Sequence, residues 1–298
     1  MILVVGCGFL GSYIARNALQ MTNEKVLCTV RDEANAPSVA GAGFAVCDVT
    51  KPEDISSLAK LTADEKLTVF YLAAQHNIDK VFENPALAAE TNIKGFESFL
   101  SLMPGIDKLF FASTDCVYGE NPQSESVFCE NSAHLEPANE YGRQKLEGEK
   151  IAVNHGFTAT RLPFMWGPSL VPGKRSFYDN VALKLKNGKT VEMIDGMRRN
   201  VLTFDCAAKL LILLSQNDKS ILPPVINVCG DRAYTKYESG LVAAGNTGAS
   251  PNQIKSISFE EGQKFFKDGR SDNSVMGNTL IKGLLGIKEI TTEEIICS

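Results

Sequence analysis

Short apolar runs alternate with longer amphipathic stretches from Ile2 to Leu162. A short continuous apolar run is typical of a strand buried on both faces of a parallel sheet. Such runs predict strands at Ile2–Val5, Lys25–Val30, Phe44–Val46, Leu67–Leu72, Lys108–Ala112 and Thr158–Leu162. The stretches between them predict helices at Ser12–Gln20, Pro52–Lys60, Pro85–Met103 and Glu140–His155. This alternation predicts an α/β fold with a doubly wound parallel sheet.

The alternation breaks after Pro163, where residues 166–176 are rich in glycine and proline. Beyond that loop the pattern predicts a helix at Phe177–Asn187, a strand at Val191–Ile194, a helix at Cys206–Ser215 and a last sheet strand at Val225–Val228. We therefore expect a dinucleotide-binding Rossmann domain over residues 1–165, to which residues 204–230 return. Residues 166–203 and 231–298 are expected to form a smaller, interleaved substrate lobe.

The motif Gly6-x-Gly8-x-x-Gly11 lies between the first predicted strand and the first predicted helix. In such a turn Gly6 permits the tight bend, Gly8 lets the backbone approach a pyrophosphate, and Gly11 lets the helix pack closely on the strand. The helix amino end offers unpaired N–H groups and a positive dipole end to phosphates. The motif alone is weak. The strand before it and the βαβ pattern around it favour a dinucleotide site over a plain glycine-rich turn.

Residues that follow the predicted strands extend this site, because ligands of doubly wound sheets bind beyond the carboxyl ends of the strands. Arg31 follows the second strand and favours NADP, since a guanidinium pairs with a 2′-phosphate. Asp32 comes next, and a shift of one residue would favour NAD instead. The expected cofactor contacts are Gly6, Gly8, Phe9, Leu10, Gly11, Arg31, Asp48, Val49, Leu72, Ala73, Ala74, Tyr141 and Lys145.

The candidate catalytic residues are Thr114, Tyr141 and Lys145. Tyr141 and Lys145 are four residues apart on a predicted helix, so their side chains project from one face. A nearby ammonium favours a phenolate, so we expect Lys145 to lower the pKa of Tyr141 toward a range useful for acid–base catalysis. Thr114 follows the fifth strand, where its hydroxyl can hydrogen-bond a substrate oxygen. The Tyr–Lys spacing is common on helices, so its weight comes from its combination with the glycine motif.

Composition and charge narrow the classes of function. The chain has 298 residues, of which 44% are hydrophobic, enough for a large core. Its net charge of -5 and the lack of a Lys/Arg run argue against a nucleic-acid partner. No apolar segment has the length of a membrane span. The eight cysteines are scattered without a CxxC or Cys/His cluster, so we predict no metal site and a reduced, cytoplasmic environment.

These motifs resemble those of the extended short-chain dehydrogenase/reductases of the NAD-dependent epimerase/dehydratase superfamily. The similar segments are GCGFLG, YLAA, NPALAAETNIKG, STDCVYG and YGRQKLEGE, with weaker similarity at RLPFMWGP and RRNVLTFDCA. STDCVYG is most similar to the segment of dTDP-4-dehydrorhamnose reductases. The resemblance implies that Thr114, Tyr141 and Lys145 are the catalytic triad. It also implies a nucleotide-sugar substrate between two lobes and a possible homodimer.

The resemblance further implies substrate contacts. Arg198 and Arg270 stand where family members bind the substrate diphosphate, and Asp115 and His76 are expected to line the same pocket. Sugar-nucleotide 4,6-dehydratases have an acid–base Glu directly after the Asp, whereas this chain has Cys116, which cannot act as a carboxylate. We therefore expect reduction of a keto group on a nucleotide-linked sugar. An epimerase that uses its cofactor transiently and a non-catalytic dinucleotide-binding regulator stay open, although the Tyr–Lys pair favours an enzyme.

Overall fold

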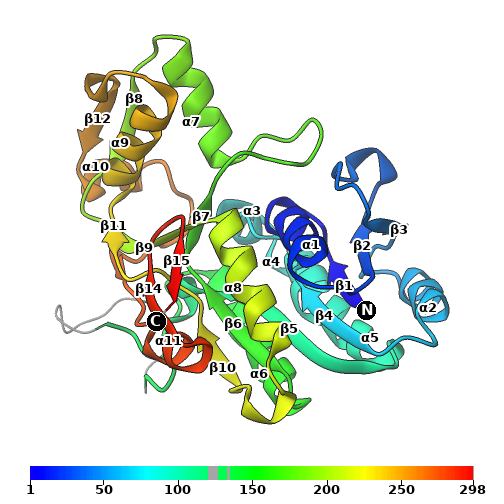
Figure 1. The fold of residues 1–298 in the computed structure, drawn as a ribbon. Helices are drawn as coiled ribbons and strands as arrows, with labels where there is room; N and C mark the ends of the chain where they lie inside the picture. Colours follow the sequence, from blue (N-terminus) through cyan, green and yellow to red (C-terminus); the bar gives the residue numbers. More distant parts are fainter. Residues whose placement is uncertain (120–126, 133–134, 298) are drawn as a thin grey trace.

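A seven-stranded parallel sheet forms the centre of the molecule (Figure 1). The computed structural model describes residues 1–119, 127–132 and 135–297. In the order β10-β6-β5-β4-β1-β2-β3, the sheet confirms the predicted doubly wound fold. The order reverses between β1 and β4, so a crevice for ligands is expected at the carboxyl ends of these strands. The strands are β1 (Ile2–Val5), β2 (Val26–Val30), β3 (Gly43–Val46), β4 (Leu67–Tyr71), β5 (Ile106–Thr114), β6 (Thr158–Leu162) and β10 (Val225–Asn227).

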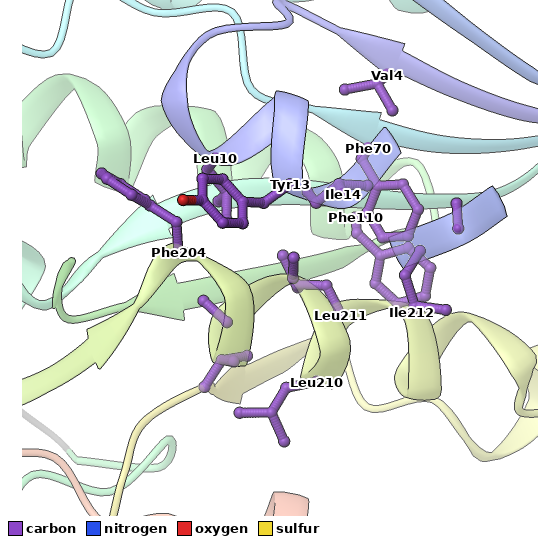
Figure 2. Close-up of a cluster of buried hydrophobic side chains, with 14 of the residues drawn as sticks. Val4, Leu10, Tyr13, Ile14, Phe70, Phe110, Phe204, Leu210, Leu211 and Ile212 are labelled. Carbon is purple, nitrogen blue, oxygen red and sulfur yellow. The ribbon is translucent and has the colours of Figure 1, made fainter. Parts of the chain in front are cut away.

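Helices cover both faces of this sheet (Figure 1). On one face α1 (Phe9–Met21) packs against α8 (Phe204–Gln216), and both meet the sheet in a buried cluster. Figure 2 shows Tyr13 and Ile14 of α1 in that cluster, with Phe70 and Phe110 of the sheet and Leu211 of α8. The opposite face is covered by α2 (Pro52–Leu61), α5 (Gly95–Leu102) and α6 (Glu140–Asn154). Within the described residues, no helix is long and apolar enough to cross a bilayer.

The helix predicted over Pro85–Met103 is interrupted by a π-helical turn at Glu90–Lys94. Asn92 lies in this turn and is buried. Its side chain accepts a hydrogen bond from the Gln75 amide at 2.7 Å and donates one to Oε1 of Gln144 at 2.9 Å. The π turn therefore connects the loop after β4 to α6. The turn is flanked by α4 (Pro85–Ala89) and α5, and α4 is preceded by α3 (Ile78–Glu83), which the pattern did not predict.

The smaller lobe is assembled from segments that are distant in the sequence (Figure 1). Two of its helices pack together, α7 (Phe177–Lys186) and α9 (Lys236–Thr247). Two short strands pair beside them, β8 (Val191–Ile194) and β12 (Ile254–Ile257). A second small sheet contains β7 (Phe164–Trp166), β9 (Arg198–Thr203), β11 (Ala233–Tyr234) and β13 (Asn273–Ser274). The short helix α10 (Phe259–Gln263) also lies in this lobe, beside β8. The last elements are α11 (Thr279–Leu285), β14 (Ile287–Ile290) and β15 (Ile295–Cys297). They pack on the Rossmann half, because Ile281, Ile287 and Ile290 are buried in the same cluster as α1 and α8.

Candidate active site

The turn between β1 and α1 has the geometry that its glycines predict. Gly6 has a φ of +88°, and a Cβ there would lie 2.7 Å from the amide nitrogen of Ala73, just past β4. A Cβ on Gly11 would lie 3.0 Å from the carbonyl oxygen of Gly6, so Gly11 allows the close packing of α1. Beside Gly8 nothing in the described chain lies within 4 Å of a Cβ position, and no described side chain caps α1. This open, uncapped helix end fits a pyrophosphate. Because α1 begins at Phe9, earlier than predicted, both Phe9 and Leu10 lie in its first turn.

Arg31 directly follows β2, at the carboxyl ends of the strands, and its side chain is exposed. Partial burial acts to raise the pKa of Asp48, but hydrogen bonds from Thr50 and the charge of Arg31 hold that pKa below its usual value. Asp32 instead accepts a hydrogen bond from the Ala34 amide at 3.0 Å, so its carboxylate is turned onto its own 3₁₀ turn. The other predicted cofactor residues at this edge of the sheet are Val49, Leu72, Ala73 and Ala74.

The first turn of α6 packs against the short 3₁₀ turn Asp115–Val117 that follows β5. Asn139 caps α6 by accepting a hydrogen bond from the Gly142 amide at 2.8 Å. A Cβ on Gly142 would lie 2.6 Å from the carbonyl oxygen of Cys116, so the glycine permits this close approach. The structure thereby brings Tyr141 close to the end of β5.

Burial sets the protonation states of Tyr141 and Lys145. Burial, together with the Cys116 thiol and the Asp115 carboxylate, raises the pKa of Tyr141. Lys145 is 2% exposed, and its Nζ lies 4.0 Å from the centroid of the Phe111 ring. Burial lowers the pKa of Lys145 to about 7, even though the charge of Glu149 opposes this shift.

The expectation that Lys145 lowers the pKa of Tyr141 is therefore wrong for this structure. Removal from water disfavours the charged form of a phenol and of an amine alike. At neutral pH Tyr141 is a phenol that can donate a proton, whereas Lys145 titrates near neutrality.

Thr114 ends β5 in a network of hydrogen bonds. Its Oγ1 donates to Oδ1 of Asp115 at 3.1 Å and accepts a bond from the Cys116 amide at 3.2 Å. The buried Asp115 also accepts a bond from the Ser274 hydroxyl at 3.2 Å. It pairs with Nε of Arg199 at 3.4 Å. The Asp115 carboxylate thus joins the end of β5 to β9 and β13 of the smaller lobe.

Sequence reasoning missed Arg199 and named its neighbour Arg198. The structure does not bring Arg198 to Asp115, because its guanidinium donates to the carbonyl oxygen of Ala233 at 3.0 Å and lies 3.8 Å from Glu238. Successive side chains on a strand point to opposite faces, so only one of the two arginines can face the cleft. If residues 198–203 are recognised as a strand in the sequence, the alternation of its side chains distinguishes Arg199 from Arg198.

Arg270 lies between the smaller lobe and the Rossmann half, where it is held by α3. Its Nη2 donates to Oδ1 of Asp79 at 2.9 Å, and the same carboxylate oxygen accepts a bond from the Lys267 amide at 3.0 Å. Oδ2 of Asp268 accepts a bond from the Glu140 amide at 3.0 Å. The segment from Lys267 to Arg270 therefore ties the lobe to α3 and to the start of α6, next to Tyr141.

His76 follows β4 on the Rossmann side, where its side chain is exposed. Although part of the ring stays exposed, the surrounding protein atoms and the charges of Lys145 and Lys80 lower the pKa of His76. It therefore lies within electrostatic reach of the candidate catalytic lysine.

A doubly wound sheet, an open glycine turn and a Tyr–Lys helix beside the fifth strand define an extended short-chain dehydrogenase/reductase. The chain belongs to the NAD dependent epimerase/dehydratase family, whose model matches residues 2–229.

Known proteins of several activities are similar to this chain. A trifunctional UDP-glucose 4,6-dehydratase/UDP-4-keto-6-deoxy-D-glucose 3,5-epimerase/UDP-4-keto-L-rhamnose-reductase of Arabidopsis thaliana is 26% identical over 223 residues, 68% of this chain and 33% of that protein. The chain spans less than half of the length of the curated relatives that it matches.

Two solved structures share the fold over almost the whole chain. DesIV, a dTDP-glucose 4,6-dehydratase of Streptomyces venezuelae with NAD bound, has a TM-score of 0.77 at 19% identity and covers 98% of this chain and 92% of its own. A hypothetical dTDP-4-dehydrorhamnose reductase of Sulfolobus tokodaii has a TM-score of 0.76 at 19% identity, with 99% and 97% covered.

Proposed function

We propose that this chain is an NADP-dependent reductase of a keto group on a nucleotide-linked sugar. The observation that carries the proposal is the position of Tyr141, a phenol at neutral pH, beside Asp115 and Cys116, the two residues that follow Thr114 at the end of β5. A reduction requires a proton for the oxygen that receives charge, and a phenol of raised pKa holds that proton at neutral pH.

The residues of the chain take separate roles in this reaction. Nicotinamide, when bound, supplies the hydride. Tyr141 donates its proton to the substrate oxygen, and the Thr114 hydroxyl turns from Asp115 to hydrogen-bond the same oxygen. Lys145, with a pKa of about 7, holds the ribose hydroxyls and supplies positive charge when the phenolate forms. The uncapped end of α1 binds the pyrophosphate.

The choice of NADP rests on the end of β2. The Asp32 carboxylate is engaged by its own turn, whereas Arg31 is exposed beside Asp48. A guanidinium at this position binds a 2′-phosphate through charge-assisted bonds. DesIV was solved with NAD, so that neighbour does not support NADP. The proposed preference for NADP rests only on Arg31 and Asp32 of this chain.

Two arginines of the lobe side, Arg199 and Arg270, support a substrate that carries a diphosphate. The activities named for the relatives support a nucleotide-linked sugar. The Arabidopsis relative acts on UDP-linked sugars and carries dehydratase, epimerase and reductase activities in one chain. Dehydration is disfavoured because burial raises the pKa of the Cys116 thiol, which stands in place of the second carboxylate. A neutral thiol cannot act as the base.

The test is the stoichiometry of cofactor use. The full chain is incubated with NADPH and a panel of UDP- and dTDP-linked 4-keto sugars, and absorbance of NADPH is compared with product formed. A reductase consumes one NADPH for each product molecule. Turnover of a nucleotide sugar without net oxidation of NADPH would overturn the proposal in favour of an epimerase. Cofactor binding without turnover of any sugar would indicate a regulatory protein.

A further inference from the structure

Three cationic side chains converge where the smaller lobe meets the Rossmann half, each from a different segment: Arg199 of β9, Lys236 of α9 and Arg270. The ring of Phe266 joins two of them, because its centroid lies 4.6 Å from Cζ of Arg270 and 5.0 Å from Nζ of Lys236. The charges of Arg199 and Arg270 both act on Lys236. The cluster therefore concentrates positive charge next to the network of Asp115.

Only two of the three cations have a carboxylate of their own. Arg270 pairs with Asp79 at 2.9 Å, and Arg199 pairs with Asp115 at 3.4 Å. Among the residues that the structure describes, none forms a hydrogen bond or ion pair with the Lys236 ammonium. The charged groups that face it are Arg199, Arg270 and the more distant Asp79.

The position of Lys236 on its own helix adds to this imbalance. Lys236 is the first residue of α9, where the positive end of the helix dipole disfavours a cation. The capping box of that helix uses Thr235 and Glu238, so the Glu238 carboxylate is bonded to the Thr235 amide at 2.8 Å. Within the described residues the ring of Phe266 is therefore the only close stabilising partner of the Lys236 ammonium, and it supplies no negative charge.

We propose that Lys236 binds a phosphate group of the nucleotide part of the substrate, and that it takes up a proton when that phosphate binds. The inference rests on the proposed function, since it assumes a nucleotide-linked substrate in this cleft. It adds to that function a residue that makes substrate binding depend on pH.

The direction of the pH dependence follows from the free protein. Burial, Arg199 and Arg270 lower the pKa of Lys236 to about 8. A bound phosphate favours the charged ammonium and raises that pKa again. Above about pH 8, binding therefore takes up a proton and affinity falls as pH rises. At pH 6.5 Lys236 is already charged and takes up no proton. The phosphate, whose second pKa is about 6, is fully ionised at pH 8.5 and does not contribute there.

Calorimetry on the full chain tests this inference with UDP and dTDP as probes. Titrations at pH 8.5 in two buffers of different protonation enthalpy give the number of protons taken up, and uridine serves as the probe without phosphate. We expect wild type to take up a measurable fraction of a proton with UDP or dTDP and none with uridine. In Lys236→Met the uptake disappears and the affinity at pH 6.5 falls about tenfold to a hundredfold, the usual effect of a hydrogen bond to a charged group.

Two further variants make the result decisive. Lys236→Arg keeps a cation that does not titrate, so it should bind nucleoside diphosphate without proton uptake and without loss of affinity from pH 6.5 to pH 9. Lys255→Met, at an exposed position on β12, should behave as wild type.

The outcomes separate the two proposals. Unchanged proton uptake and affinity in Lys236→Met and Lys236→Arg would overturn the inference and leave the proposed function standing. If wild type binds neither nucleotide at pH 6.5 or 8.5, the nucleotide-linked substrate is overturned and the inference with it.

Discussion

Arginine–carboxylate pairs lie in both halves of the molecule, but the two halves use them differently. In the Rossmann half Arg161 and Glu149 are 2% and 3% exposed and pair through three hydrogen bonds, at 2.7, 2.9 and 3.2 Å. They lie on α6 and β6, which are consecutive along the chain. On the lobe side, the side chains of Arg199 and Arg270 are 14% and 12% exposed, and each pairs with a residue from a distant segment.

The difference separates charges that hold the fold from charges that, under the proposed function, would meet the substrate. Glu149 also accepts a hydrogen bond from the Ser113 hydroxyl, and Arg161 lies 4.6 Å from the centroid of the Tyr118 ring. No solvent or ligand can replace these buried partners. At the lobe, a phosphate can take the place of Asp79 beside Arg270. A cleft that leaves charge uncompensated gains binding energy for an anion, whereas a buried core with the same imbalance loses stability.

The largest effect is expected at the chemical step itself. Tyr141→Phe removes the proton donor and should lower kcat by about 10² to 10⁴, the range of a general acid, while cofactor binding is retained. Turnover kinetics and NADPH titration measure the two properties. Tyr178→Phe, whose ring packs on Trp166 in the lobe, is the matched control and should keep wild-type turnover. A Tyr141→Phe enzyme with near-normal kcat would remove Tyr141 from the mechanism.

The next largest effect tests the buried pair. Glu149→Gln leaves the Arg161 charge uncompensated and should lower the free energy of unfolding by about 3 kcal/mol, measured by urea denaturation. Glu147→Gln changes the same helix two residues away, where the carboxylate pairs with Lys150 on the surface, and should cost less than about 1 kcal/mol. Equal losses in both variants would show that the buried Arg161–Glu149 pair holds the fold no more than a surface pair does.

The smallest effect is expected on cofactor affinity, at the exposed Arg31 that follows β2. Arg31→Ala should weaken NADPH binding about tenfold and leave NADH binding unchanged, because only NADPH offers a 2′-phosphate to a guanidinium. Fluorescence titration with both cofactors measures this, and the difference should shrink at high salt because the contact is exposed. Tighter binding of NADH than of NADPH by wild type would show that the cofactor is NAD.

The sequence pattern predicted the features that depend on residues close together in the chain. The glycine turn, the strands of the sheet and the i, i+4 spacing of Tyr141 and Lys145 each depend on a few neighbouring residues. The π turn around Asn92 was missed because one extra residue in a helical turn leaves the apolar pattern almost unchanged. Arg199 was missed because β9 receives its partners from distant segments, β7, β11 and β13. Lys236 was missed because the cations beside it, Arg199 and Arg270, are also distant in the sequence. The raised pKa of Tyr141 depends on burial, which the helix pattern does not contain.

The bond between Asp268 and the Glu140 amide has a consequence for how the protein is made. The two residues are 128 positions apart. All seven strands of the central sheet leave the ribosome before Asp268 does. A nascent chain that has reached β10 thus already contains the candidate catalytic residues but lacks the segment that holds the start of α6. The order of translation places assembly of the cofactor half first and completion of the substrate cleft last.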